Sequence, residues 1–240
     1  MILANLPQAI TAIGGLGTAA FGLLEAIKPV FPGINHMGFG RIRTTISSLT
    51  PSEPGAHPPL NALPQSNVLD SLLANWVNGT DLNSQKSIAK SLIKLHLSAG
   101  NAPALAAATN VDPALLSEVA RSIASSTALT QPQSDAYSRF DLIVTAMLDE
   151  AYQHADQVYR NSTRGLAALL AVALAFAGGL SLAGSAGGLD LAGSLKVFWW
   201  KPDMFLSLLI GLLATPLAPI AKDISSALST AVNTMQAIKK

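Results

Sequence analysis

The chain contains no cysteine among its 240 residues. This absence excludes disulfides, thiolate zinc sites, iron–sulfur clusters and cysteine nucleophiles. Charge is also scarce, because 14 acidic and 15 basic side chains make up only 12% of the chain, against about 25% in soluble domains. The formal net charge of +1 excludes a strongly basic nucleic-acid binder of the usual kind.

Apolar residues are abundant instead, at 50% of the chain with a mean hydropathy of +0.39. Three windows carry no charge at all: residues 1–24, 165–189 and 204–221. A helix needs about 20 mainly apolar residues to cross roughly 30 Å of hydrocarbon. The sequence therefore predicts an all-α integral membrane protein with three transmembrane helices and a small cytoplasmic helical domain.

Basic residues near these windows predict the orientation. Eight lie on one side of the expected membrane: Lys28, Arg41, Arg43, Arg160, Arg164, Lys222, Lys239 and Lys240. The loop between the second and third windows has only Lys196 and Lys201. The positive-inside rule then predicts a multi-pass inner-membrane protein with its N-terminus outside and its C-terminus in the cytoplasm. The first basic residue follows the first apolar run, which favours an anchor over a cleaved signal peptide; a buried or interfacial helix is the alternative.

These signals predict seven regions along the chain. They are a first membrane helix (1–28), a Pro/Gly-rich connector (29–65), a cytoplasmic helical domain (66–133), a long helix entering the second span (134–189), an outer loop (190–203), the third span (204–222) and an amphipathic cytoplasmic tail (223–240). Within the domain, Asp112-Pro113 is typical of a helix start. Asn83 or Ser84 is expected to begin a helix that ends at Gly100.

Two groups of charged residues each allow two interpretations. Lys86, Lys90 and Lys94 recur every four residues, as expected of a face lying on anionic lipid headgroups or of a solvated face. Asp149, Glu150 and His154 form the nearest approach to a metal or acid–base cluster, for which a solvated helix face is the expected interpretation.

Small residues repeat every four positions in all three windows, which predicts faces where helices approach closely in lipid. The predicted packing residues are Gly14, Thr18, Gly22, Ala171, Ala175, Gly179, Ala183, Gly187, Ser207, Gly211 and Thr215. A chance product of a composition rich in alanine and glycine is the alternative. The tail adds a two-heptad seam that predicts assembly or local packing: Ile224, Leu228, Ala231, Met235 and Ile238.

No pattern of catalytic or ligand-binding residues accompanies these features. The sequence has no phosphate-binding glycine loop, no His-Glu-x-x-His and no Gly-x-Ser-x-Gly. No ionisable side chain lies within a predicted span, so proton relays and ion-coupled transport lack their usual signature. The sequence thus predicts no catalytic residue, no metal, no cofactor and no nucleic-acid partner.

The layout resembles that of uncharacterised bacterial membrane proteins with an N-terminal anchor, a cytoplasmic helical region and a long amphipathic helix leading into a C-terminal membrane pair. The matching stretches are residues 23–27, residues 140–150 and Tyr159-Arg160. The second stretch lacks the tryptophan and basic cluster of that pattern. This resemblance implies a layout and no activity.

The function expected from these patterns is that of a non-enzymatic, membrane-embedded structural or accessory subunit. It would assemble through small-residue helix faces, as a homo-oligomer or within a larger membrane complex. The alternative is an oligomeric pore or a membrane-perturbing protein. Its lining would come from Thr11, Thr18, Ser181, Ser185 and Thr215.

Overall fold

The computed structural model describes residues 6–51, 63–187, 193, 195, 199, 202 and 204–219. All regular secondary structure in these ranges is helical, which confirms the predicted all-α class. The helices are α1 (Leu6–Ile27), α2 (Pro32–Asn35), α3 (Phe39–Leu49), α4 (Gln65–Val77), α5 (Leu82–Leu95), α6 (Ala102–Thr109), α7 (Pro113–Ala124) and α8 (Gln131–Gly187), and an apolar helix follows over Met204–Pro219.

The chain forms two compact units. Residues 33–160 make one, called here the bundle unit, and residues 1–32 with 161–240 make the other, called the apolar unit. Helix α8 contributes its first part to the bundle unit and its second part to the apolar unit.

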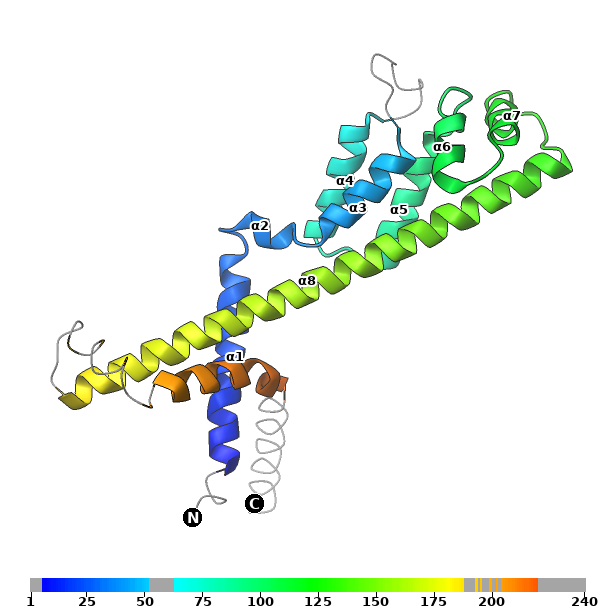
Figure 1. Ribbon diagram of the computed structural model, residues 1–240. Coiled ribbons are helices and arrows are strands. Elements are labelled where there is room, and N and C mark those ends of the chain that lie inside the picture. The colour runs from blue at the N-terminus through cyan, green and yellow to red at the C-terminus, as the bar shows by residue number, and fades with distance from the viewer. Residues whose placement is uncertain are drawn as a thin grey trace, which may run out of the picture. The chain divides into compact units, whose positions relative to one another are not determined.

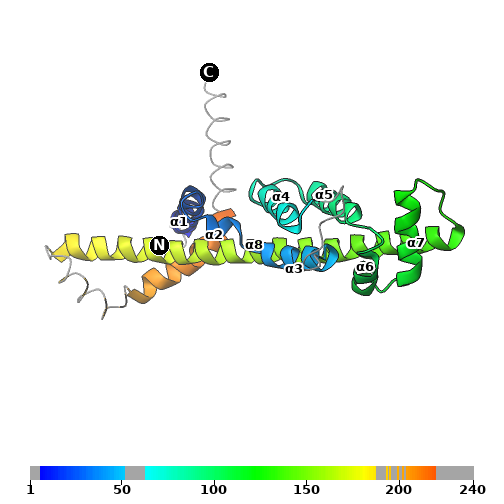
Figure 2. The ribbon, with the colours of Figure 1, turned by 90° about the horizontal axis from the view of Figure 1, so that it is seen from above.

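In the bundle unit, helices α3 to α7 pack along the first part of α8, with α6 and α7 near its N-terminus (Figures 1 and 2). One face of α8 supplies one wall of the core, with large apolar side chains at every fourth position. Phe140, Val144, Leu148 and Tyr152 are each at most 1% exposed. Helices α3, α4 and α5 contribute Ile46, Leu72 and Ile93 to the same cluster.

Two helices of this unit, α5 and α7, begin at a side-chain cap. Asp112 Oδ1 accepts hydrogen bonds from the backbone amides of Ala114 and Leu115, at 2.8 and 2.9 Å, which confirms the predicted start of α7. The predicted start of α5 at Asn83 or Ser84 is wrong, because Asp81 is the cap and accepts from both of those amides. A carboxylate caps more effectively here than the neutral side chains after it, since it also faces the positive end of the helix dipole.

Helix α3 lies inside residues 29–65, so the prediction of a connector over that whole range is wrong. Four of its side chains, Phe39, Ile42, Ile46 and Leu49, are at most 3% exposed. Their spacing of three, four and three residues is that of one helix face. Most prolines of this range lie after α3, from Pro51 to Pro64. Residues 52–62 lie outside the described part of the chain.

The apolar unit contains α1, the second part of α8 and the helix over Met204–Pro219 (Figure 1). Among the described residues, two helices are long and apolar enough to cross a membrane: Ala9–Ile27 and Gln131–Leu182. The third predicted span corresponds to the helix over Met204–Pro219, which is shorter than the length expected of a full crossing.

Candidate functional site

Small residues bring the three helices of the apolar unit into close contact. Ala20 of α1, Ala171 of α8 and Ala214 meet in one cluster, and each is 0% exposed. A Cβ built on Gly17 would lie 2.0 Å from the carbonyl oxygen of Ala214, and one on Gly211 would lie 2.5 Å from Cα of Val172. At both places the backbones approach so closely that only glycine fits.

The predicted packing residues do not all lie at this contact. Gly14, Ala171, Ser207 and Gly211 are buried, and Ala175, Gly179 and Thr215 are partly buried. Thr18 and Gly22 are exposed. The side chains at positions 183 and 187, and the whole predicted tail seam over 224–238, lie outside what the structure describes.

Helix geometry explains why the stripe of α1 leaves the buried face. At about 100° per residue, a strict four-residue repeat drifts by roughly 40° at each step. From Gly14 to Gly22 the drift is about 80°, so the buried face follows Gly17, Ala20 and Leu24 instead. Alternating steps of three and four residues would have identified that face from the sequence.

The outward surface of the apolar unit carries large apolar side chains. Leu169 is 67% exposed, Leu182 72% and Phe205 68%. Among the residues proposed as pore-lining, Thr18 donates its hydroxyl to the carbonyl of Gly14 at 3.1 Å, which satisfies this group within its own helix. Ser181 is exposed.

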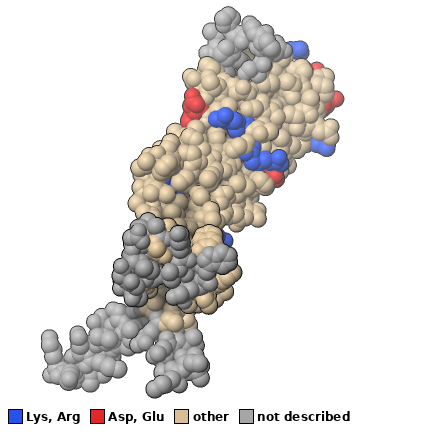
Figure 3. All heavy atoms as spheres, turned by 60° about the vertical axis from the view of Figure 1, so that its left-hand side comes forward, with Lys and Arg blue, Asp and Glu red and all other residues tan. Residues whose placement is uncertain are grey.

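In the bundle unit the lysine stripe of α5 faces carboxylates of α8. Lys86 lies 2.7 Å from Asp149, while Lys90 and Lys94 both pair with Asp141, at 2.6 and 2.5 Å. We call this set of ion pairs the α5–α8 ladder. Neither interpretation of the stripe from sequence anticipated it, because both of them left the lysines without protein partners. On the face drawn in Figure 3, several basic side chains lie beside acidic ones.

The acidic pair next to His154 is likewise engaged. Asp149 belongs to the ladder, and Glu150 accepts two hydrogen bonds from the Arg41 guanidinium, at 2.9 and 3.3 Å. In the part of the chain that the structure describes, no three His, Asp or Glu side chains are placed to hold a metal ion.

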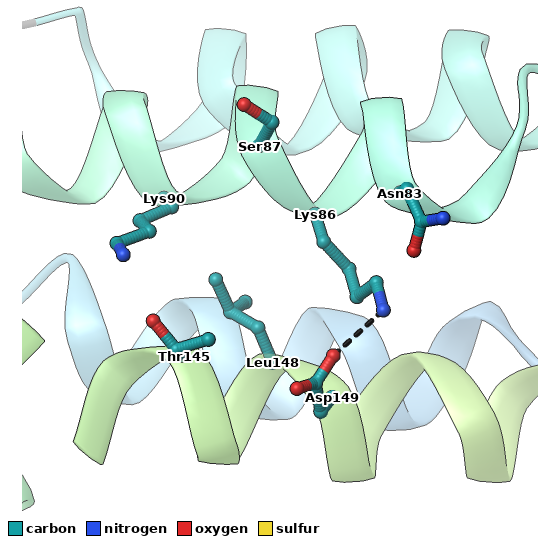
Figure 4. A pocket seen from close by; sticks show the side chains of 7 residues that line it. All are labelled: Asn83, Lys86, Ser87, Lys90, Thr145, Leu148 and Asp149. Carbon is teal, nitrogen blue, oxygen red and sulfur yellow. Dashed lines mark hydrogen bonds and ion pairs between the residues drawn. The ribbon is translucent and has the colours of Figure 1, made fainter. Parts of the chain in front are cut away.

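A hollow of about 230 Å³ opens between α5 and α8 beside the ladder. Figure 4 shows its lining: Asn83, Lys86, Ser87 and Lys90 come from α5, and Thr145, Leu148 and Asp149 from α8. Polar groups and ammonium groups therefore share one small concave surface with the side chain of Leu148.

The ladder makes stability depend on pH at its Asp141 end. Burial alone would raise the pKa of Asp141, but hydrogen bonds from Lys90 and Lys94 outweigh it and lower this pKa. The hydrogen bond to Asp141 raises the pKa of Lys94 despite burial. The contribution of Asp141 is therefore complete above about pH 4 and is lost as the pH falls through its folded pKa. That of Lys94 is complete below about pH 10 and is lost as the pH rises through its own folded pKa.

We expect Asp141→Asn to lower the free energy of unfolding by about 1–2 kcal/mol at neutral pH, since two ammonium groups lose a charged acceptor. Thermal unfolding of the full chain in an uncharged detergent, followed by circular dichroism between pH 3 and pH 9, measures the effect. The difference from the unmodified protein should shrink below pH 4. Asp70→Asn, at an exposed position of α4, is the control and should change little at any pH.

No protein-family model matches the chain, and neither a curated protein nor a solved structure shows significant similarity to it. The arrangement of its own residues is therefore the basis for any functional conclusion: an apolar unit held together by small residues, joined through α8 to a bundle unit that carries an ion-pair ladder.

Proposed function

We propose that the chain is a non-enzymatic structural or accessory subunit embedded in the bacterial inner membrane, with the apolar unit crossing the bilayer. One observation carries this proposal. The apolar unit buries alanine and glycine in its centre, whereas Leu169, Leu182 and Phe205 are each about two-thirds exposed or more. In water such a distribution would be unfavourable, because each of those side chains gains about 1.5–3 kcal/mol from burial.

Lipid reverses this preference. Leucine is as apolar as the acyl chains, so helices associate there by close backbone approach and dispersion contacts rather than by hiding large side chains. The contacts of Gly17 with Ala214 and of Gly211 with Val172 are of this kind. Only 22% of the apolar window of α1 and 11% of that of α8 are buried within the protein. The core helix of a soluble protein would be mostly buried, so these low shares support the membrane assignment.

The helix over Met204–Pro219 serves as a third crossing in this proposal. Lys201 and Lys222 flank it in the sequence, and long basic side chains extend to the headgroups when a span is short. The bundle unit and the C-terminus then lie in the cytoplasm, where the flanking basic residues favour them.

Assembly with other subunits uses the small residues that the internal contact leaves exposed. Thr18 and Gly22 lie on the exposed side of α1, and a Cβ on Gly22 would meet no atom within 4 Å. A neighbouring membrane helix can approach such a surface closely, and Thr18 presents no unsatisfied hydroxyl to it. The same surface is available to a second copy of this chain or to another subunit of a larger complex.

Cysteine labelling tests the topology, since the natural chain has no cysteine and gives no background. We expect Ser194→Cys and Ser84→Cys to react with a membrane-impermeant maleimide from opposite sides. In intact spheroplasts only Ser194→Cys should be labelled, and in inverted vesicles only Ser84→Cys. Equal labelling of both variants in either preparation would contradict the three-span arrangement.

A further inference from the structure

The α5–α8 ladder has three cationic positions and only two anionic ones. Lys86 pairs with Asp149 and Lys94 with Asp141, so residue numbers rise along α5 while they fall along α8. In this antiparallel register the position opposite Lys90 is residue 145, midway between the two aspartates. That residue is Thr145, and Lys90 reaches instead to Asp141, which it shares with Lys94.

The hollow described above lies at this position. Lys90 and Thr145 both line it, from α5 and α8 respectively (Figure 4). Its volume of about 230 Å³ is several times the roughly 30 Å³ that one water occupies in the liquid. A tetrahedral oxyanion with some of its hydration water therefore has room where a third carboxylate is missing.

The donors around the hollow suit such a ligand. Each lysine ammonium has three N–H donors, of which the ladder uses one in Lys86 and one in Lys90. Ser87 and Asn83 of α5 add two neutral polar side chains to the lining. Thr145 already donates its hydroxyl to the backbone carbonyl of Asp141, at 2.7 Å, and adds no charge.

The local charge favours an anion by one unit. Three lysines face two aspartates in the ladder, and Asp149 at the rim is neutralised by Lys86 at 2.7 Å. Lys90 and Lys94 share the single carboxylate of Asp141, so the charge of one ammonium is not balanced within the ladder. An added anion beside Lys90 would balance it. We propose that this hollow binds the phosphate group of a small ligand or of an anionic lipid, which completes the ladder between α5 and α8.

The test uses the full chain in an uncharged detergent and inorganic phosphate as the probe, with sodium chloride at equal ionic strength as the reference. A ligand that binds the folded protein and not the unfolded chain raises the melting temperature. A phosphate concentration ten times the dissociation constant gives a rise of about 3–5 °C. We expect such a rise in the natural protein at 50 mM phosphate. Arg139→Gln, an exposed cation of α8 outside the hollow, should keep it.

Three variants locate the effect. Thr145→Glu supplies the missing carboxylate, so it should melt at a higher temperature in chloride and lose the phosphate increment. The glutamine of Thr145→Gln has nearly the same volume as glutamate but no charge, so this variant should not gain stability in chloride. Lys90→Gln removes the ammonium and should at least halve the increment, which keeps the proposal testable if the residue 145 variants fold poorly.

Nanodiscs distinguish the two sources of phosphate. An increment with inorganic phosphate in detergent supports a soluble ligand. An increment in phosphatidylglycerol over phosphatidylcholine discs, lost in Thr145→Glu, supports a lipid phosphate. The proposal is overturned if the natural protein shows neither increment, or if Thr145→Glu and Lys90→Gln keep the full increment of the natural protein.

Discussion

Gly17→Ala is expected to weaken the apolar unit, because the added methyl group would lie 2.0 Å from the carbonyl oxygen of Ala214. The Cβ is fixed by the backbone of α1 and the oxygen belongs to the backbone of the other helix, so a rotamer change cannot relieve the overlap and the helices must move apart. Overpacking of this kind costs about 1–3 kcal/mol, and the shift also loosens the contacts around Ala20. Alanine is the better helix former by about 1 kcal/mol, so any net loss of stability reports on the contact itself.

Gly15→Ala is the matched control on the same helix. The chemical change is identical, but nothing lies within 4 Å of the added Cβ, so the variant should be as stable as the natural protein or more stable by up to about 1 kcal/mol. Melting temperatures in detergent and in nanodiscs compare the two variants. If Gly15→Ala and Gly17→Ala behaved alike, the close contact between α1 and the helix over 204–219 would be wrong.

Gly22→Leu distinguishes the stability of the single subunit from its assembly with other subunits, and it can be measured alongside the two variants above. Its added side chain points into open space, so the melting temperature of the isolated subunit should be unchanged or slightly higher, since leucine is the better helix former. A neighbouring helix seated on this surface would be displaced, and the mass of the detergent-solubilised complex, measured by light scattering, should fall. An unchanged mass would count against assembly through this face.

Gly38→Ala is expected to have the larger effect in the bundle unit. Gly38 precedes α3 with φ +88°, in a region that costs an L-residue roughly 1–2 kcal/mol. Its added Cβ would also lie 2.2 Å from the backbone carbonyl oxygen of Ala155 on α8. Strain and overlap together should destabilise the unit by about 3–5 kcal/mol.

Gly40→Ala provides the control two residues further on. This residue lies within α3, is exposed, and would meet nothing within 4 Å of an added Cβ. It should therefore gain about 1 kcal/mol from its higher helix propensity. Far-UV circular dichroism and limited proteolysis of the full chain measure the difference. Equal melting temperatures for Gly38→Ala and the natural protein would contradict the packing of α3 on α8.

The features of the fold that could be predicted from the sequence depend mainly on local patterns of residues. Helical periodicity, the Asp112 cap and the charge-free windows each depend on residues within a few turns of one another, and such signals are present in the chain before it folds. Helix α3 was missed for a local reason as well. Because prolines are dense from Pro51 onward, the whole of residues 29–65 was predicted to be a connector. The spacing of Phe39, Ile42, Ile46 and Leu49 is nevertheless that of a helix face.

What the sequence determined by itself is therefore the helical class, the apolar segments, and the existence of a lysine stripe and of small-residue repeats. Only the tertiary structure decided what these faces contact. Lys86 and Asp149 are 63 residues apart in the chain, and no local pattern relates them. Gly17 meets Ala214 because two helices cross at that point, and a crossing depends on the shapes of both surfaces. Periodicity describes one helix at a time, whereas packing is a property of pairs of helices.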